Sequence, residues 1–224
     1  QPRYAEHDRA VFDAVIEAAR VLAEQEFAPH AAKLDANEPT FDGKRVTLPA
    51  ELEQTLDAYI AGGFMGIAAE AEHGGMQLPW VVGQAACAWF AAADVSANSY
   101  PLITHSAVNL LTEFGNDDQK RRYLEPMVAG RFFGTMCLSE PQAGSSLSDI
   151  QLRAEPTTDG HYLIKGTKMW ISGGEHELSE NIVHLVLAKI PGGPPGVKGI
   201  SLFVVPKIRV NDDGTLEAVM ALPV

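Results

Sequence analysis

The sequence of 224 residues contains only two cysteines, Cys87 and Cys137, and they lie far apart in the chain. Neither belongs to a Cys-x-x-Cys pattern, and neither has a histidine at metal-ligand spacing. This usage argues against a disulfide framework and against a structural zinc site. The few cysteines predict a reducing compartment, so we expect a cytoplasmic protein. The absence of metal-ligand spacing leads us to expect no metal site.

Positive charge is also scarce. Lys and Arg number 17 against 29 Asp and Glu, which gives a net charge of -12. Such a chain repels phosphate backbones and anionic lipid headgroups, so roles on nucleic acid or on a membrane surface are disfavoured. No uncharged apolar run approaches the ~18 residues that span a bilayer, and the polar N-terminus has no signal-peptide core. Because the first residue is not methionine, we expect a longer parent chain.

What is present begins with helical periodicity over the first 130 residues. Val11, Val15, Ala18 and Leu22 recur at intervals of three and four, which predicts an amphipathic helix within residues 8–32. An Ala-rich, nearly uncharged stretch over 78–94 predicts a helix that is covered on all sides. Caps, glycines and acidic first turns predict further helices over 49–61, 102–114 and 117–129.

After Gly130 the apolar period changes to two. Four short β-branched or aromatic runs, bounded by turn residues, predict antiparallel strands. They cover residues 132–138, 161–165, 182–188 and 199–206. A helical block followed by a β block predicts an α+β fold. We expect an all-α domain over 1–130 and an antiparallel, barrel-like β domain over 131–224.

Two polar segments of the β block are candidates for ligand binding. Residues 137–146, CLSEPQAGSS, follow a predicted strand and offer N–H groups and hydroxyls that suit a phosphate. Residues 166–174, GTKMWISGG, place Trp170 near Ser172 on a predicted strand edge, offering an aromatic plane and a donor to a flat ring. Taken singly, the first segment could be an ordinary serine-rich turn, and Trp170 in the second could be a core residue. Together they indicate one ligand with a phosphate end and a planar end.

These segments resemble the two flavin-binding motifs of the acyl-CoA dehydrogenase family. The likeness lies in Ser139 to Ser145, in Gly166 to Ser172 and, upstream, in Glu113 to Leu124. The motifs follow the family's order and cover nearly the whole chain. Residues 172–184, SGGEHELSENIVH, are longer than the common family form. They resemble the large bacterial branch that includes the 3-(methylthio)propanoyl-CoA dehydrogenases.

The resemblance implies an FAD-dependent oxidoreductase that introduces an α,β double bond into an acyl-CoA thioester. Leu138 and Ser139 would contact the isoalloxazine ring. Gly144 and Ser145 would approach the pyrophosphate, and Ser145 would also touch the CoA portion of the substrate. Trp170 would pack against the ring system, and Ser172 would bond near N5 and O4. The implied cofactor-binding residues are Met136, Leu138, Ser139, Gly144, Ser145, Trp170, Ile171 and Ser172.

Two positions depart from the family pattern. Gln142 stands where glycine is usual, which would stiffen the loop, and Ser146 stands where aspartate is usual, which removes a carboxylate. The resemblance also implies a C-terminal helical bundle that carries the catalytic glutamate and much of an oligomer interface. We therefore expect the β domain to be truncated, and we assign no catalytic residue within this chain.

The resemblance further implies an electron-transfer flavoprotein as electron acceptor, a homo-oligomer and a place in fatty acid metabolism. The alternative is a non-catalytic protein that binds flavin or acyl-CoA, or another protein, on the same scaffold. A third option, the DNA-binding relatives of the family, calls for a basic patch that the net charge of -12 disfavours.

Three other features have simpler explanations. Glu175, His176 and Glu177 could ligate a metal, but alternation along an extended segment would turn His176 away from its neighbours. His73 and His105 would form a catalytic pair only if the fold joined them, and nothing in their spacing indicates this. Residues 100–109 would approach the acyl chain in the family arrangement, although ordinary helix packing explains them equally well.

Overall fold

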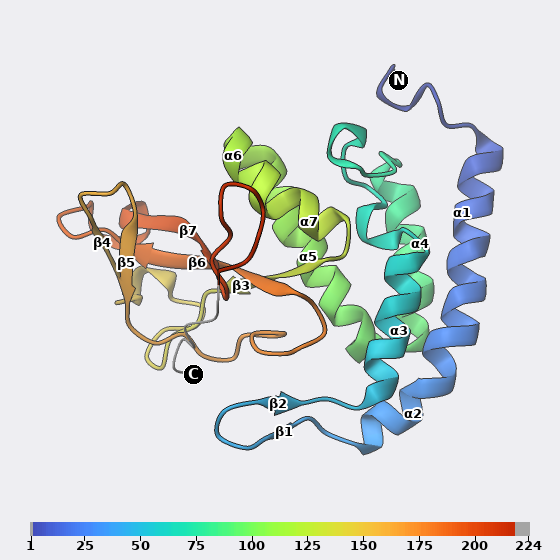
Figure 1. Ribbon diagram of the computed structural model, residues 1–224, viewed down its shortest axis with the longest axis horizontal. Helices are drawn as coiled ribbons and strands as arrows, with labels where there is room; N and C mark the ends of the chain where they lie inside the picture. The colour runs from blue at the N-terminus through green and yellow to red at the C-terminus, as the bar shows by residue number, and fades with distance from the viewer. Residues whose placement is uncertain (1, 218–224) are drawn as a thin grey trace.

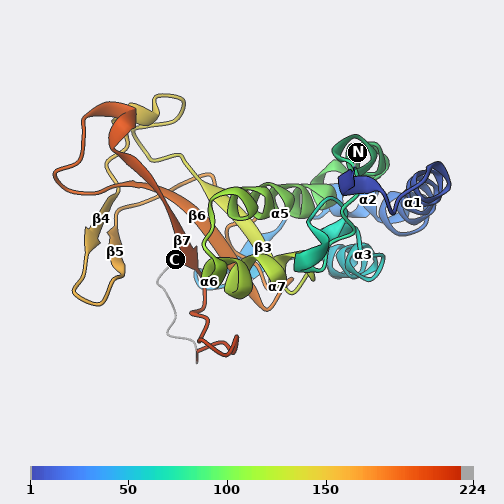
Figure 2. The same cartoon turned by 90° about the horizontal axis from the view of Figure 1, so that it is seen from above.

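The computed structural model describes residues 2–217, in which a group of helices stands beside one β-sheet (Figure 1). Helix α5 lies between the two parts and runs along strand β3, as the view from above also shows (Figure 2). The helices are α1 (Arg9–Leu22), α2 (Ala28–Ala36), α3 (Ala50–Ala61), α4 (Trp80–Ala93), α5 (Val95–Phe114), α6 (Asp117–Gln119) and α7 (Glu125–Val128). π-helical turns at Ala23–Phe27 and Lys120–Leu124 join α1 to α2 and α6 to α7.

Helix α5 begins earlier than the sequence pattern predicts. Asp94 caps it by accepting hydrogen bonds from the N–H groups of Ser96 at 2.9 Å and Ala97 at 3.1 Å. Such a cap satisfies two N–H groups that the first turn leaves free. Pro101 therefore lies inside the helix rather than at its start. The predicted end is confirmed, because the N–H of Gly115 closes the last turn on the carbonyl of Leu111.

The buried face of α1 differs from the predicted stripe. Ala19, Ala23 and Phe27 are buried, whereas Val11 is 37% exposed and Ala18 is also exposed. The buried line is rotated by about one residue, because the small Ala19 and Ala23 permit close approach of α4. The prediction that α4 is covered on all sides is also wrong, since Val81 is 73% and Trp80 56% exposed.

The sheet contains five strands in the order β3-β6-β4-β5, with β7 paired to β6. Strands β4 and β5 form an antiparallel hairpin, and β6 and β7 are also antiparallel. Strand β3, however, runs parallel to β6, with Phe132 opposite Asn181 and Cys137 opposite Val186. The strands are β3 (Phe132–Cys137), β4 (Arg153–Pro156), β5 (Tyr162–Lys165), β6 (Asn181–Lys189) and β7 (Ile200–Pro206).

The prediction of a wholly antiparallel sheet is therefore wrong. Parallel partners need a long crossover between them, and here the β4–β5 hairpin lies within the chain between β3 and β6. The crossover also contains the two candidate segments. Over residues 2–217 the sheet does not close, so a barrel-like form stays a prediction. A separate hairpin of β1 (Thr40–Phe41) and β2 (Val46–Thr47) precedes α3.

The helices and the sheet meet where α5 covers β3. The hydroxyl of Thr104 accepts a hydrogen bond of 3.1 Å from the N–H of Gly134. A Cβ atom on Gly134 would lie 2.5 Å from the Cβ of Ala107, so only glycine permits this approach. The helix thereby holds β3, and the loop that follows it, in a defined place.

Both cysteines are buried and free. Over the described residues, no helix combines the length and apolar character that crossing a membrane requires.

Candidate functional site

The loop after β3, residues 138–146, is shaped by one buried carboxylate. Glu140 is 6% exposed, and its backbone forms two hydrogen bonds with Ala143, at 2.8 and 3.1 Å, that close a tight turn. Its side chain accepts hydrogen bonds from the N–H groups of Gln151 at 2.6 Å and Leu152 at 3.1 Å. Glu140 thus fastens the loop to the chain that enters β4.

The cation that neutralises this carboxylate comes from the second candidate segment. The ammonium of Lys168 lies 2.8 Å from Oε1 of Glu140 and 3.0 Å from the carbonyl oxygen of Leu138. Burial alone would raise the pKa of Glu140, but the N–H of Gln151 and the charge of Lys168 hold it below its usual value. The ionised pair therefore joins the two segments.

A backbone contact completes the junction. The N–H of Met169 donates to the carbonyl of Ser139 at 3.0 Å. The structure thus brings together the two segments that the sequence predicts to share one ligand. It corrects their form, because residues 166–172 belong to an irregular connection and not to a strand edge.

Trp170 is the most unusual residue of this junction. Its side chain is 84% exposed, and its φ of +60° lies in the left-handed region. A residue other than glycine in that region costs roughly 1–2 kcal/mol, and such strain gathers at functional sites. The neighbouring Ile171 packs instead against the sheet, on the cluster around Leu152 and Ala154. Trp170 is therefore not a core residue, which was the alternative explanation of this segment, and its aromatic plane faces outward.

The loops around Trp170 present free hydrogen-bond donors. Within residues 2–217, the backbone N–H groups of Gly144, Ser145, Ile171 and Ser172 have no acceptor. A Cβ atom on Gly144 would meet nothing within 4 Å, so the backbone there is open to a ligand. Ser145 and Ser172 are exposed, and Met136, Leu138 and Ser139 are half-buried. An anion at one end and a flat ring at the other fit this arrangement.

Sequence reasoning missed three side chains in and beside the junction, namely Lys168, Glu140 and Lys189. Lys168 and Glu140 form the pair described above, and their opposite charges within the two motifs are the signal that would have revealed it. Gln142, which the departure from the family pattern singles out, donates to Oε2 of Glu140 at 2.7 Å. The amide therefore adds one more hydrogen bond to the same carboxylate. Lys189 adds a positive charge, donating to the carbonyl of Ser148 at 2.6 Å.

The two histidines considered as a catalytic pair have separate partners. Nδ1 of His73 lies 3.3 Å from a carboxylate oxygen of Glu125. Nε2 of His105 lies 3.1 Å from the carbonyl of Phe64, and burial lowers the pKa of His105. The two histidines therefore contact different partners and do not form a pair.

The Glu175–Glu177 stretch does not form a ligand set. His176 is buried, while the two glutamates bind Lys207 and Arg45 respectively. Among the described residues, no three His, Cys, Asp or Glu side chains gather as metal ligands. The expectation that His176 turns away from its neighbours is confirmed, although the segment is a loop rather than a strand.

Two histidines lie near α5 and the sheet, the buried His176 and the half-buried His184. Burial lowers the pKa of His176 to about 4, and the charges of Lys207 and His184 act in the same direction. Burial also lowers the pKa of His184 to about 4, with Glu175 opposing this effect and Lys207 adding to it. Nδ1 of His184 lies 2.7 Å from the hydroxyl of Thr135 on β3.

These two groups predict a loss of stability in mild acid. The unfolded chain takes up a histidine proton near pH 6.5, whereas the folded chain does so near pH 4. Between these values the unfolded state holds more protons, so acidification favours it, by roughly 3 kcal/mol for each histidine at the acid end. Urea unfolding between pH 7 and pH 5 measures the effect, because most carboxylates stay ionised there.

A pair of variants tests whether these histidines cause the pH dependence of the unfolding free energy. Replacing His184 with Gln should reduce the dependence of the unfolding free energy on pH, whereas replacing the exposed His161 with Gln should leave it unchanged. Equal slopes for both variants would contradict the assignment.

The chain is similar to known proteins over both its helical part and its β part. Residues 12–131 match the model "Acyl-CoA dehydrogenase, N-terminal domain", and residues 135–219 match "Acyl-CoA dehydrogenase, middle domain". The 3-methylmercaptopropionyl-CoA dehydrogenase of Ruegeria pomeroyi is 46% identical over 187 residues, which are 84% of this chain and 32% of that protein. The chain thus spans about a third of that relative's length.

Solved structures share the fold. The glutaryl-CoA dehydrogenase of Mycobacterium smegmatis superposes with a TM-score of 0.71 at 26% identity, over 89% of this chain and 46% of that one. An acyl-CoA dehydrogenase from Bacillus anthracis, described in complex with FAD, gives a TM-score of 0.69 at 24% identity, over 91% of this chain and 32% of that one. On the match of both domain models, the chain belongs to the acyl-CoA dehydrogenase family.

Proposed function

We propose that this chain forms the FAD-binding part of an enzyme that dehydrogenates an acyl-CoA thioester between its α and β carbons. The observation that carries the proposal is the junction of the 138–146 loop with the connection around Trp170, through the Glu140–Lys168 pair and the Met169–Ser139 hydrogen bond. It sets an exposed aromatic plane and open N–H groups near one another. FAD, when bound, would supply the acceptor of the substrate's β hydride.

The residues at this junction suit the parts of the cofactor. We assign Met136, Leu138 and Ser139 to the side of the ring system, and Trp170, Ile171 and Ser172 to its edge. A hydroxyl and N–H groups at Ser172 can stabilise charge on a ring that gains electrons. The backbone at Gly144 and Ser145 offers donors to a pyrophosphate, and the exposed Ser145 also suits the CoA portion of the substrate. No residue of this chain is assigned as the catalytic base.

We also propose two domains, 1–130 and 131–224, and a barrel-like closure of the sheet in the complete protein. An electron-transfer flavoprotein as acceptor and a homo-oligomeric assembly are part of the same proposal. They rest on family membership and on no contact described above.

The visible absorption spectrum of the complete polypeptide tests the function. We expect a flavin band that survives gel filtration and bleaches when an acyl-CoA of suitable chain length is added. A flavin band that shifts without bleaching across a series of acyl-CoAs would favour the non-catalytic alternative. A protein that retains no flavin after reconstitution with FAD would contradict the proposal.

A further inference from the structure

The segment from Gly173 to Asn181, the first residue of β6, lies directly after the proposed flavin-facing residues, and we call it the strap. Its first residue has a left-handed φ of +62°, and a Cβ atom there would lie 3.5 Å from the ring of Tyr100 on α5. The N–H of Gly174 then donates to the carbonyl of Ile171 at 3.1 Å. The strap therefore fixes the chain just beyond Trp170 and Ser172.

Three glutamates tie the strap to three different parts of the fold. Glu177 receives two hydrogen bonds from Arg45 Nη2, at 2.5 and 2.7 Å, from the β1–β2 hairpin. Glu180 receives two bonds, at 2.8 and 2.7 Å, from Arg131, which precedes β3. Glu175 binds the ammonium of Lys207, which follows β7. Exposed pairs are each worth little, but three from separate elements define the strap's path.

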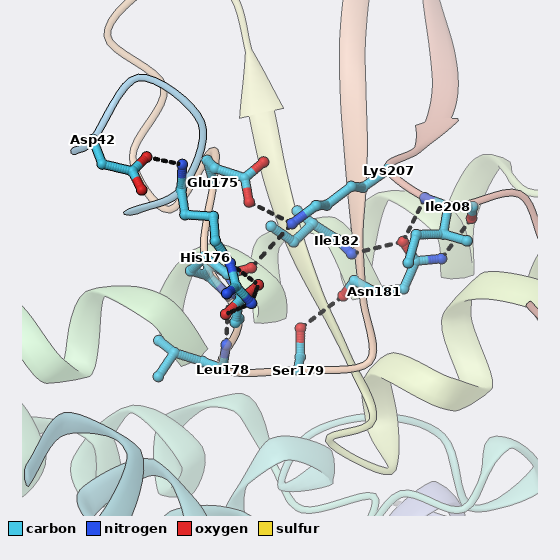
Figure 3. A network of polar contacts seen from close by, with 11 residues as sticks. Asp42, Glu175, His176, Leu178, Ser179, Asn181, Ile182, Lys207 and Ile208 are labelled. Carbon is cyan, nitrogen blue, oxygen red and sulfur yellow. Dashed lines mark hydrogen bonds and ion pairs between the residues drawn. The ribbon is translucent and has the colours of Figure 1, made fainter. Parts of the chain in front are cut away.

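The far end of the strap is held by one buried amide. Oδ1 of Asn181 accepts from the N–H groups of Ile182 and Ile208, each at 2.9 Å, and its Nδ2 donates to the carbonyl of Ile208 at 2.7 Å (Figure 3). The hydroxyl of Ser179 donates to the carbonyl of Asn181 at 2.7 Å. The strap is thus anchored at both ends.

His176 occupies the centre of the strap and is 2% exposed. Its ring centroid lies 5.5 Å from those of Tyr100 on α5 and Phe133 on β3, in edge-on contacts of 76° and 63°. Nδ1 accepts a hydrogen bond of 3.2 Å from the N–H of Leu178, and the carbonyl of His176 accepts one of 3.2 Å from Lys207 (Figure 3). The residue therefore joins helix, sheet and strap.

The ring is held neutral with its proton on the other nitrogen. The charged and titratable groups that face it are Lys207 after β7, His184 on β6, Glu175 on the strap and Tyr100 on α5. Burial and the positive charge of Lys207 disfavour protonation of the ring. Since Nδ1 accepts, Nε2 carries the hydrogen, and it finds no partner among the described residues. An unpaired buried donor costs about 1–3 kcal/mol.

We propose that the strap positions the flavin-facing residues Trp170–Ser172, and that His176 is its positioning residue, acting through the Nδ1 acceptor that fixes Leu178. The inference rests on the proposed function and adds a role for a segment that lies outside the two flavin-facing segments. Without the acceptor, the N–H of Leu178 loses its partner, and the strap that carries the Gly174–Ile171 hydrogen bond loses one of its fixed points.

Two variants of the complete polypeptide separate positioning from packing. Replacing His176 with Phe keeps a ring between Tyr100 and Phe133 but removes the acceptor, and it also removes the unpaired donor. Replacing His176 with Asn keeps an acceptor near the place of Nδ1 but loses the ring. We expect the Phe variant to unfold near the wild-type temperature yet to bind FAD about 5–10-fold more weakly. We expect the Asn variant to be less stable yet to bind FAD within about 2-fold of wild type.

The readouts are the FAD dissociation constant, the visible circular dichroism of the bound flavin and the melting temperature, with His161→Phe as the exposed control. The flavin dichroism should change in the Phe variant and be restored in the Asn variant. FAD affinity that follows stability, with Phe binding better than Asn, would overturn the positioning role while leaving the proposed function intact. A wild-type protein that binds no FAD would overturn both.

Discussion

Replacing Glu140 with Ala is expected to lower the free energy of unfolding by about 3–5 kcal/mol. The side chain of Lys168 is only 9% exposed, so the variant would leave an uncompensated charge in the interior. It would also leave the N–H groups of Gln151 and Leu152 without their acceptor. Urea unfolding at pH 7 measures the loss, and weaker FAD binding should accompany it because Glu140 joins both loops.

Two further variants test this explanation. Asp13 forms an ion pair with Arg9 on the surface of α1, with the two side chains 59% and 87% exposed. Replacing Asp13 with Ala should cost less than ~1 kcal/mol, because exposed pairs contribute little. Replacing Lys168 with Met in the Glu140→Ala background should recover part of the loss, since it removes the unpaired charge. A Glu140→Ala cost no larger than that of Asp13→Ala would contradict the role of the buried pair.

Replacing Trp170 with Ala is expected to raise the dissociation constant of FAD by about 10–100-fold, with little effect on unfolding. An aromatic side chain that stacks on a flat heterocycle contributes roughly 1–3 kcal/mol, as judged by alanine substitution. The loss of such a contact, at 1.4 kcal/mol for each factor of ten, accounts for a change of this size. In the protein itself Trp170 is 84% exposed, so its removal leaves no cavity. Fluorescence titration of the apoprotein with FAD measures the first effect, and thermal unfolding measures the second.

Another exposed tryptophan provides the matched control. Trp80 on α4 is 56% exposed and lies outside both loops, so Trp80→Ala should leave FAD affinity unchanged. A bulky Ser145→Phe substitution tests the phosphate end and should also weaken FAD binding, because it narrows the approach to the open backbone at Gly144. Unchanged flavin content in both the Trp170 and Ser145 variants would remove the site assignment.

Much of the fold could be predicted because its causes are local. The end of α5 at Gly115, the start of α3 after Pro49 and the run of β3 depend on caps, turn residues and side-chain period within a few positions. Strand β4, Arg153–Pro156, escaped prediction because it is short and mostly exposed and contains a proline.

The candidate site could be predicted in composition but not in form. The two motifs and their residues are visible in the sequence, and the Met169–Ser139 contact brings them together. The left-handed backbone of Trp170 and the burial of His176 were not visible in the sequence. An exposed and a buried aromatic residue look alike until their neighbours are known, and those neighbours lie on α5, β3 and the chain after β7.

The sequence by itself determined the helical and β blocks, the turns that bound their elements, the acidic charge and the motifs of an acyl-CoA dehydrogenase. Only the tertiary structure decided that β3 runs parallel to β6, that Glu140 and Lys168 share one buried pair and that the strap closes on His176. The physical reason is the distance along the chain over which each kind of interaction acts. Caps and side-chain period act over a few residues, whereas strand direction, burial and ion pairing depend on contacts between residues that are distant along the chain.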